Sequence, residues 1–336
     1  MRKNLDNYEK EENKENNNNI KEKEKIQVIN IRTILVNDNK DKEFDSFTKC
    51  NDGIFALKYI DYIDIIESLI YLYNEKVYFS EYPSFKRIVE YENNINIMDI
   101  YYCNYQKNSN KLYVNYNGKG FTNIYLIKNK SIKLLEEKIP LDIDDLIEIS
   151  SIKIIVLDKT NNFCSCFELK NKIYQEIKKF TKGENIYSVK RSPNGNKFFI
   201  MNTNCIQVYD SKTLELINVI NIKNNDICFI NNNNFIIFAT DFLILFNLKT
   251  FKKLDEYYYS HIFMGRLHKI GNKGYFIAAE LINVSRVKIL ELHNNKINYI
   301  RELDKNTIPF CTSLYFNNTL FIGGFNKIFM FTLDIK

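Results

Sequence analysis

The stretch from Ile186 to Ile220 constrains the fold more than any other part of the sequence. It contains four short segments, each too short for a helix and each bounded by turn residues. Ser192-Pro193-Asn194-Gly195 predicts the first turn, because proline presets φ and Asn194 and Gly195 tolerate the left-handed conformation that follows. Residues alternate with a period of two from Ile206 to Asp210, as in a strand. The stretch is therefore predicted to be one antiparallel unit of four strands.

The central hairpin of this unit recurs seven times along the chain. In each unit an apolar strand precedes another strand across a short turn, and these expected third strands are 76–82, 122–128, 162–170, 205–210, 242–249, 286–293 and 327–334. The equivalent positions are taken as Ser80, Leu126, Phe167, Tyr209, Phe246, Leu290 and Phe331. They lie 37 to 46 residues apart, which is close to the length of a propeller blade. Two units also share a turn into the fourth strand, Lys212-Thr213-Leu214 and Lys249-Thr250-Phe251.

The triplet Val208-Tyr209-Asp210 stands where WD repeats place a hydrophobe, Trp and Asp, so this unit resembles a WD repeat. The resemblance implies an all-β fold, a seven-bladed β-propeller, but no specific subfamily. The repeats are degenerate: no Gly-His dipeptide occurs and no unit has Trp before Asp. The hydrogen-bonded tetrad typical of WD repeats therefore cannot be assembled from these residues, and the fold has to form on β-pattern and packing.

The two ends of the chain are expected to differ in structure. Residues 1–25 are charged and Asn-rich, with seven basic and seven acidic residues, and are predicted to be a disordered tail. Residues 26–336 are predicted to form a single propeller domain. The seventh unit ends at Lys336 without a fourth strand, while Ile26–Val36 has the pattern of a strand with no partner. We therefore expect Ile26–Val36 to pair with Lys327–Asp334 and to close the last blade.

Composition bounds the compartment and the partners. Seven cysteines, an odd number without regular spacing, argue against a disulfide framework and favour a reducing compartment, cytoplasmic or nuclear. The N-terminus lacks a signal peptide's apolar run, and Phe235–Leu248, the most apolar run, is too short to span a membrane and contains Asp241. The net charge of +6 is spread over the folded part, so it is compatible with RNA or acidic partners and requires neither.

The residues that could carry chemistry do not form a recognisable site. Cys164 and Cys166 face one side of an expected strand, but a zinc site needs a second pair of ligands. The histidines are His261, His268 and His293, all in the sixth unit, with no nucleophile in a known context. We therefore expect buried structural thiols, scattered histidines, and no catalytic, cofactor or metal site.

Two further patterns have structural interpretations. The acidic group Asp142, Asp144, Asp145 and Glu148 lacks the central glycine of a calcium loop and is expected to be a solvated connector. The glycine pairs of 118–120 and 271–274 each lie between two strands, so hairpin turns are expected in place of phosphate loops.

The candidate interaction residues are Tyr257, Tyr258, Tyr259, Arg266 and His268, because Tyr and Arg are enriched at binding hot spots. The alternative interpretation is an amphipathic outer strand in a Tyr-rich protein. The expected function is a non-catalytic protein-interaction scaffold, a subunit of an intracellular complex, with no obligate homo-oligomer and no membrane insertion. The alternative function is an RNA-associated propeller in translation or ribosome assembly, which salt-sensitive binding would distinguish.

Overall fold

The computed structural model describes residues 26–35, 57–63, 68–73, 76–81, 84, 88, 95, 100–116, 119–128, 131–159, 161–182, 185–239, 241–258, 264–270, 275–281, 287–302, 312–316, 318–323 and 327–335. Every regular element in these residues is a strand. Over the same ranges, no helix has the length and apolarity to cross a membrane. The predicted tail (residues 1–25) lies outside the described residues.

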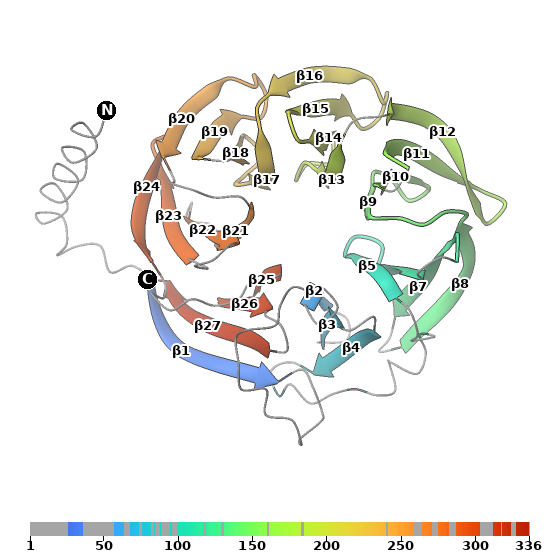
Figure 1. Cartoon of the computed structure of the whole chain (residues 1–336), viewed down its shortest axis with the longest axis horizontal. Coiled ribbons are helices and arrows are strands. Elements are labelled where there is room, and N and C mark those ends of the chain that lie inside the picture. The colour runs from blue at the N-terminus through green and yellow to red at the C-terminus, as the bar shows by residue number, and fades with distance from the viewer. Residues whose placement is uncertain are drawn as a thin grey trace, which may run out of the picture.

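The strands form consecutive antiparallel units arranged in a ring (Figure 1). The first three units are β2 (Leu57–Ile63), β3 (Ser68–Tyr73) and β4 (Lys76–Glu81); β5 (Ile100–Gln106), β6 (Lys111–Tyr116), β7 (Thr122–Lys128) and β8 (Ser131–Ile139); β9 (Asp145–Glu148), β10 (Lys153–Asp158), β11 (Phe163–Lys170) and β12 (Ile173–Lys182). The next three are β13 (Ile186–Arg191), β14 (Lys197–Asn202), β15 (Cys205–Asp210) and β16 (Leu216–Asn221); β17 (Asn224–Phe229), β18 (Asn234–Ala239), β19 (Phe242–Asn247) and β20 (Lys253–Tyr258); β21 (Met264–Ile270), β22 (Tyr275–Leu281), β23 (Val287–His293) and β24 (Lys296–Glu302). The last comprises β25 (Thr312–Phe316), β26 (Thr319–Gly323), β27 (Lys327–Ile335) and β1 (Ile26–Leu35).

Sheet order shows how the units are built. Strands that follow one another in sequence are neighbours in each sheet, and one parallel contact, Ile173 with Lys138, joins β12 to β8 into an eight-stranded sheet. Beside β4, the N–H of Ile88 donates to the carbonyl of Phe79 at 2.9 Å, where a fourth strand of the first unit is expected. The fold is thus the all-β propeller that the sequence predicts.

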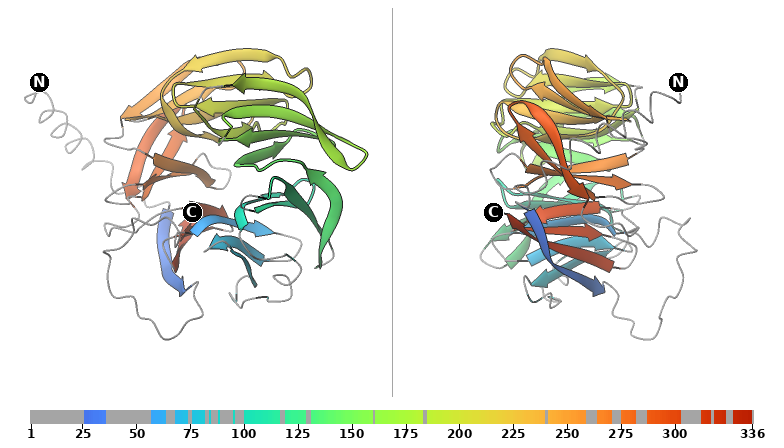
Figure 2. Two further views of the ribbon diagram at one scale, coloured as in Figure 1. Left: turned by 45° about the vertical axis from the view of Figure 1, so that its right-hand side comes forward. Right: turned by 90° about the vertical axis from the view of Figure 1, so that its left-hand side faces the viewer.

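The N-terminal strand closes the last unit, as predicted. β1 pairs antiparallel with β27 from Ile26 opposite Ile335 to Leu35 opposite Lys327, and the sheet order is β1-β27-β26-β25. Figures 1 and 2 both show the blue strand β1 alongside the red strand β27. The two ends of the ring are therefore joined by backbone hydrogen bonds, which protect the edge of β27.

The third-strand positions that the sequence analysis takes as equivalent are structurally equivalent in six units, and the position chosen in β7 is one residue off. In those six units the chosen third-strand residue pairs with the second residue of the preceding strand, as in Phe198 with Tyr209 and Phe235 with Phe246. In β7 this position belongs to Tyr125, opposite Leu112, and not to Leu126. The segment around Tyr125 is apolar on both faces, so alternation could not fix its register.

The core consists of apolar layers between adjacent units. Phe198 and Ile200 of β14 pack in a cluster with β10 and β11, while Phe199 and Met201 of the same strand pack in a cluster with β18 and β19. Successive side chains of a strand point to opposite faces. Because both faces of a middle strand are covered by neighbouring units, these strands are apolar in their central positions, as in β18, where all six residues are buried and five are apolar.

The repeated Lys-Thr triplets form the same turn in two units. The side-chain oxygens of Asp210 and Asn247 each accept the backbone N–H groups two and three residues ahead, at 2.8 to 3.0 Å. The next residue adopts a left-handed conformation, with φ of 61° at Leu214 and 55° at Phe251. Its N–H donates to the carbonyl of the capping residue in both units. Both apolar side chains join the inter-unit core, which offsets the backbone strain.

Candidate interaction site on the inner strands

A pocket of about 320 Å³ lies among the first strands of four consecutive units, β5, β9, β13 and β17. We call it the inner-strand pocket. Figure 1 shows that these strands are the innermost of their units. The pocket is lined by Asn104, Tyr105, Gln106, Asp145, Leu146, Ile147, Val189, Lys190, Arg191 and Phe229.

The same polar position recurs on the four inner strands. Tyr102, Asp145, Ser188 and Asp226 each precede the residue that pairs with the fourth residue of the unit's second strand. On β5, β13 and β17 a β-bulge lies directly before this position. A bulge bends a strand and re-aims its side chains. The repeated geometry places a ring of polar groups where neighbouring units meet.

Asp145 links three units through its carboxylate. It accepts hydrogen bonds from the Oγ of Ser188 at 2.8 Å, the N–H of Val189 at 3.0 Å and the hydroxyl of Tyr102 at 3.3 Å. Burial, and then the charge of Asp145, raise the pKa of Tyr102 well above its usual value, so the phenol remains a donor. The carboxylate thereby holds β9 and β13 together where both strands line the pocket.

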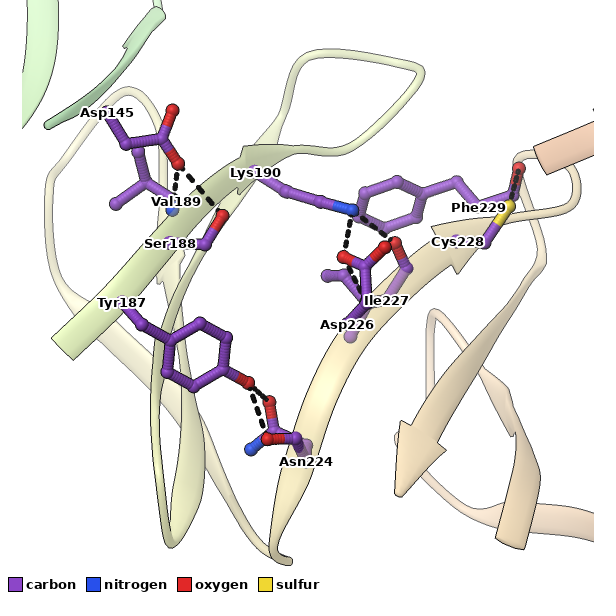
Figure 3. Close-up of polar contacts among 10 residues, drawn as sticks. All are labelled: Asp145, Tyr187, Ser188, Val189, Lys190, Asn224, Asp226, Ile227, Cys228 and Phe229. Atoms are coloured by element: carbon purple, nitrogen blue, oxygen red, sulfur yellow. Dashed lines mark hydrogen bonds and ion pairs between the residues drawn. The ribbon is translucent and has the colours of Figure 1, made fainter. Parts of the chain in front are cut away.

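An ion pair joins the next two inner strands (Figure 3). The ammonium group of Lys190 contacts the carboxylate of Asp226 and donates to the carbonyl of Ile227 at 2.7 Å. The side chain of Asp226 is 11% exposed and that of Lys190 is 31% exposed, so water screens the pair only in part. From the same strand, the hydroxyl of Tyr187 donates to the carbonyl of Asn224 at 2.8 Å. These contacts fix β13 against β17.

Arg191 leaves hydrogen-bonding capacity in the pocket. Its Nη2 donates to the carbonyl of Ile149 at 3.1 Å, while its Nε is buried and has no partner among the described residues. On β5, Nε2 of Gln106 donates to Oδ1 of Asn104 at 2.5 Å and to the carbonyl of Leu146 at 3.2 Å. The pocket lining therefore includes both amide and guanidinium groups.

The pocket lining combines few charged groups with two aromatic residues, Tyr105 and Phe229. Its charged residues are Lys190, Arg191 and Asp145, and Lys190 is paired with Asp226, which lies outside the lining. Phe229 is half-buried, with its ring centroid 5.1 Å from that of Phe199. Within the described part of the chain, no group of three or more His, Cys, Asp or Glu residues is arranged to hold a metal ion. The chemistry of the pocket is that of hydrogen bonding and apolar contact.

The predicted tyrosine site is spread over two sheets. Tyr257 is half-buried against the core between two units, and Tyr258 is 56% exposed, with its ring 5.4 Å from that of Phe242. Tyr259 lies outside the described residues. Arg266 and His268 are on β21, opposite Ala279 and Ile277, and their side chains are outside the described part. Because β20 and β21 are opposite edges of successive sheets, the backbone does not place the five residues on one strand.

The acidic group is more ordered than a solvated connector, so that expectation was wrong for two of its members. Asp145 and Glu148 belong to the inner strand β9. Glu148 is 7% exposed and accepts hydrogen bonds from the hydroxyls of Ser109 and Tyr113, both at 2.7 Å. Asp142 precedes the strand and is half-buried, and burial raises its pKa. Asp145 and Glu148 therefore make contacts between units.

Other sequence expectations can be placed directly. Cys164 and Cys166 are fully buried in one core cluster, which confirms structural thiols on one side of β11. Gly120 has φ of 70° in the turn between β6 and β7, as a hairpin requires. His293 is exposed at the end of β23, whereas His261 and the 271–274 turn lie outside the described residues.

Sequence reasoning missed the inner-strand pocket, although a signal was present. The second strands begin with Lys111, Lys153, Lys197 and Asn234 and share one apolar pattern. Aligning the units on these strands, instead of on the third strands, would have placed the polar residues of the first strands eight or nine positions before the second strand in all four units.

Comparison with known proteins identifies the fold and no family. No family model matches the sequence, and no curated protein matches it. Among solved structures, a chain from the crystal structure of a mitotic checkpoint complex is similar, with a TM-score of 0.66 and 9% identity over 90% of this chain and 93% of that chain. In all, 1323 chains of solved structures match, so the likeness is to a widely used architecture. The chain has the fold of a β-propeller.

Proposed function

We propose that this chain is a WD-repeat-like propeller that acts as a non-catalytic protein-interaction scaffold, as a subunit of an intracellular multiprotein complex in the cytoplasm or nucleus. The observation that carries the proposal is the inner-strand pocket, an open concavity built from four units. Its lining offers amides, a guanidinium and an aromatic ring, the groups that recognise an extended protein segment. The similar chain also belongs to a structure of a multiprotein complex.

The charges of the pocket favour a protein segment over RNA. A site for a polyanion neutralises phosphates with an excess of Lys and Arg. Here the lining has only two cations, Lys190 and Arg191, beside the acid Asp145, and Lys190 is already paired with Asp226. A protein segment, by contrast, presents N–H and carbonyl groups in alternation. The buried Nε of Arg191 is a donor that such a carbonyl would satisfy.

The residues of the WD-like triplet have structural roles that support this assignment. The ring of Tyr209 stacks on that of Phe198, with centroids 5.2 Å apart and an interplanar angle of 9°. Asp210 caps the turn into β16. A Trp-Asp pair at this position would serve the same packing and capping, so the unit keeps the roles with other residues.

Affinity purification with mass spectrometry tests the proposal. The tagged full chain is compared with a pocket variant, Arg191→Ala with Gln106→Ala, in cells that express the protein. The matched control replaces an exposed cation and an exposed amide of the outer strands and turns, Lys252→Ala with Gln175→Ala. We expect a defined set of proteins that the pocket variant loses and the control keeps.

Two results would overturn the proposal. The first is an identical set of proteins with all three chains, which would mean that the pocket has no part in binding. The second is a set that disappears on nuclease treatment and with rising salt, which would indicate the RNA-associated alternative.

A further inference from the structure

The outer strand β16 lacks the charged side chains that the other described outer strands carry. It is the edge of its sheet, and its sequence, Leu216 to Asn221, contains no charged residue. The other described outer strands all do: Lys133, Glu136, Glu137 and Lys138 on β8; Glu176, Lys178, Lys179 and Lys182 on β12; Lys253, Asp255 and Glu256 on β20; Lys296, Arg301 and Glu302 on β24; Arg32 on β1. Charges, above all lysine, normally keep edge strands from pairing with other chains.

The side chains of β16 are apolar and open to solvent. Leu216 is 52% exposed, Ile217 is 43% exposed and Val219 is 39% exposed. No other strand pairs with β16 in the described part of the chain apart from β15. An edge strand presents a row of N–H and carbonyl groups that are free to pair. Apolar side chains and open backbone groups thus coincide on one strand.

Outer strands of this protein already pair with each other elsewhere in the ring. Ile173 of β12 lies opposite Lys138 of β8, and the N–H of Lys138 donates to the carbonyl of Lys172 at 3.2 Å. The outer rim is therefore compatible with edge-to-edge contact between units.

We propose that β16 pairs antiparallel with β16 of a second copy of this chain, around a two-fold axis through Asn218. In this register Ile217 lies opposite Val219 of the second copy, and Leu216 lies opposite Ile220. Apolar side chains therefore meet apolar side chains on each face, and the two Asn218 amides face each other. The contact is independent of the inner-strand pocket.

Charge identifies a second copy as the occupant. A two-fold pair sets a strand against itself, so every charged residue is brought near its own copy, and like charges opposite each other are destabilising. β16 is the outer strand, among those described, for which self-pairing brings no such repulsion. A single six-residue strand buries less surface than a stable interface does. The dimer is therefore weak, with a dissociation constant in the micromolar range, and is not obligate.

Sedimentation velocity of the full chain at about 1 to 100 µM tests the proposal. We expect a dimer fraction that grows with concentration and is lost in Ile217→Lys, because the ammonium group would lie opposite the apolar side chain of Val219 of the second copy and diagonal to its own copy. The control is Leu254→Lys on the charged strand β20, where the residue is 38% exposed; it should behave as the unchanged chain. A monomer at all concentrations, or a dimer that survives Ile217→Lys, would overturn the proposal. Equal loss in both variants would show general apolar association and would overturn it too.

Cross-linking of an introduced cysteine tests the register of the two β16 strands, and it does so without placing a charge on the strand. Asn218→Cys should form an intermolecular disulfide under mild oxidation, because residues opposite each other in an antiparallel pair lie about 4.5 to 5.5 Å apart at Cα. Asn221→Cys is the control, since in this register its two copies are roughly 20 Å apart. Cross-linking of Asn221→Cys and not of Asn218→Cys would contradict the proposed axis.

Discussion

A side-chain carbon added at Gly195 would lie 2.5 Å from Nη2 of Arg191, so the turn and the guanidinium compete for the same space. Gly195 also has φ of 72°, a conformation that side chains with a Cβ rarely adopt. The turn after β13 is therefore coupled to a residue that lines the inner-strand pocket. Sequence reasoning had assigned Gly195 to the turn alone.

Gly195→Ala should both lower the thermal stability of the protein and displace the guanidinium group of Arg191. The left-handed conformation costs a residue with a Cβ about 1–2 kcal/mol, and the added carbon pushes the guanidinium away from the carbonyl of Ile149. Thermal melting measures the first effect and partner binding the second. Asn196→Ala, at an exposed residue of the same turn without positive φ, is the control and should change neither. A variant that melts and binds as the unchanged chain does would refute the coupling.

The Lys190–Asp226 ion pair should show measurable coupling between units. Lys190→Met leaves the carboxylate of Asp226 in a largely buried position, which costs about 1.5–3 kcal/mol, and Asp226→Asn relieves part of that cost. A double-mutant cycle by urea unfolding should give a coupling energy of roughly 1–2 kcal/mol.

The same cycle on Lys253 and Glu256 provides the control. This pair lies on β20 with side chains 51% and 35% exposed, and exposed pairs contribute about 0.5 kcal/mol or less. Equal coupling energies for the two pairs would contradict the view that the inner-strand pair fixes β13 against β17.

Asp210 should stabilise the turn into β16 in a pH-dependent way. Hydrogen bonds from the N–H groups of Thr213 and Lys212 lower the pKa of its carboxyl. Its contribution is then fully present above the unfolded pKa of about 3.9 and is lost as the pH falls through the lower folded value. Asp210→Ala should lower the melting temperature at pH 7 by an amount that shrinks toward acid, where the protonated carboxyl keeps an acceptor oxygen and loses its charge.

Asp210→Asn separates the cap from its charge. Asn247 already occupies the equivalent position with the same hydrogen bonds, so the amide keeps the turn. This variant should melt close to the unchanged chain at pH 7 and lack the acid-dependent component. A loss as large as that of Asp210→Ala would show that charge, and not the acceptor oxygen, supports the turn.

The closing strand β1 should be required for stability, whereas the residues before it should not. A chain beginning at Ile26 keeps the whole ladder with β27, while one beginning at Asn37 removes it and leaves the edge of β27 open. Melting curves should coincide for the full chain and the first truncation. The second should melt lower or aggregate, and equal melting of both truncations would contradict ring closure by β1.

The sequence predicted the fold because its local signals agree with one another. Pro193 and Gly195 mark a turn, and the paired Lys-Thr triplets mark another that the structure repeats at Asp210 and Asn247. The strand pattern of Ile26–Val36 had no partner and the last unit lacked a fourth strand, and together these two features predicted the pairing of β1 with β27. The left-handed conformation falls on Gly195 and not on Asn194, whose side chain instead accepts a hydrogen bond from the Oγ of Ser192.

The site could not be predicted in the same way because it depends on register between units. Asp145 is an acid near other acids in the sequence, and only the ring places it against Ser188, forty-three residues further along. Tyr257 to Tyr259 are candidates in the sequence because tyrosine is enriched at binding hot spots. Residue type alone does not determine which edge of a sheet a residue occupies. Contacts that join units are set by the order of the blades.

Photo-cross-linking from two aromatic positions tests the central claim most directly. p-Azidophenylalanine replaces Phe229 in the inner-strand pocket in one chain, and Tyr258 on the outer strand β20 in the other. After irradiation in cells that express the protein, the account predicts a protein cross-linked at position 229 and not at position 258. Cross-links to a protein at position 258 alone, or to RNA at position 229, would contradict it.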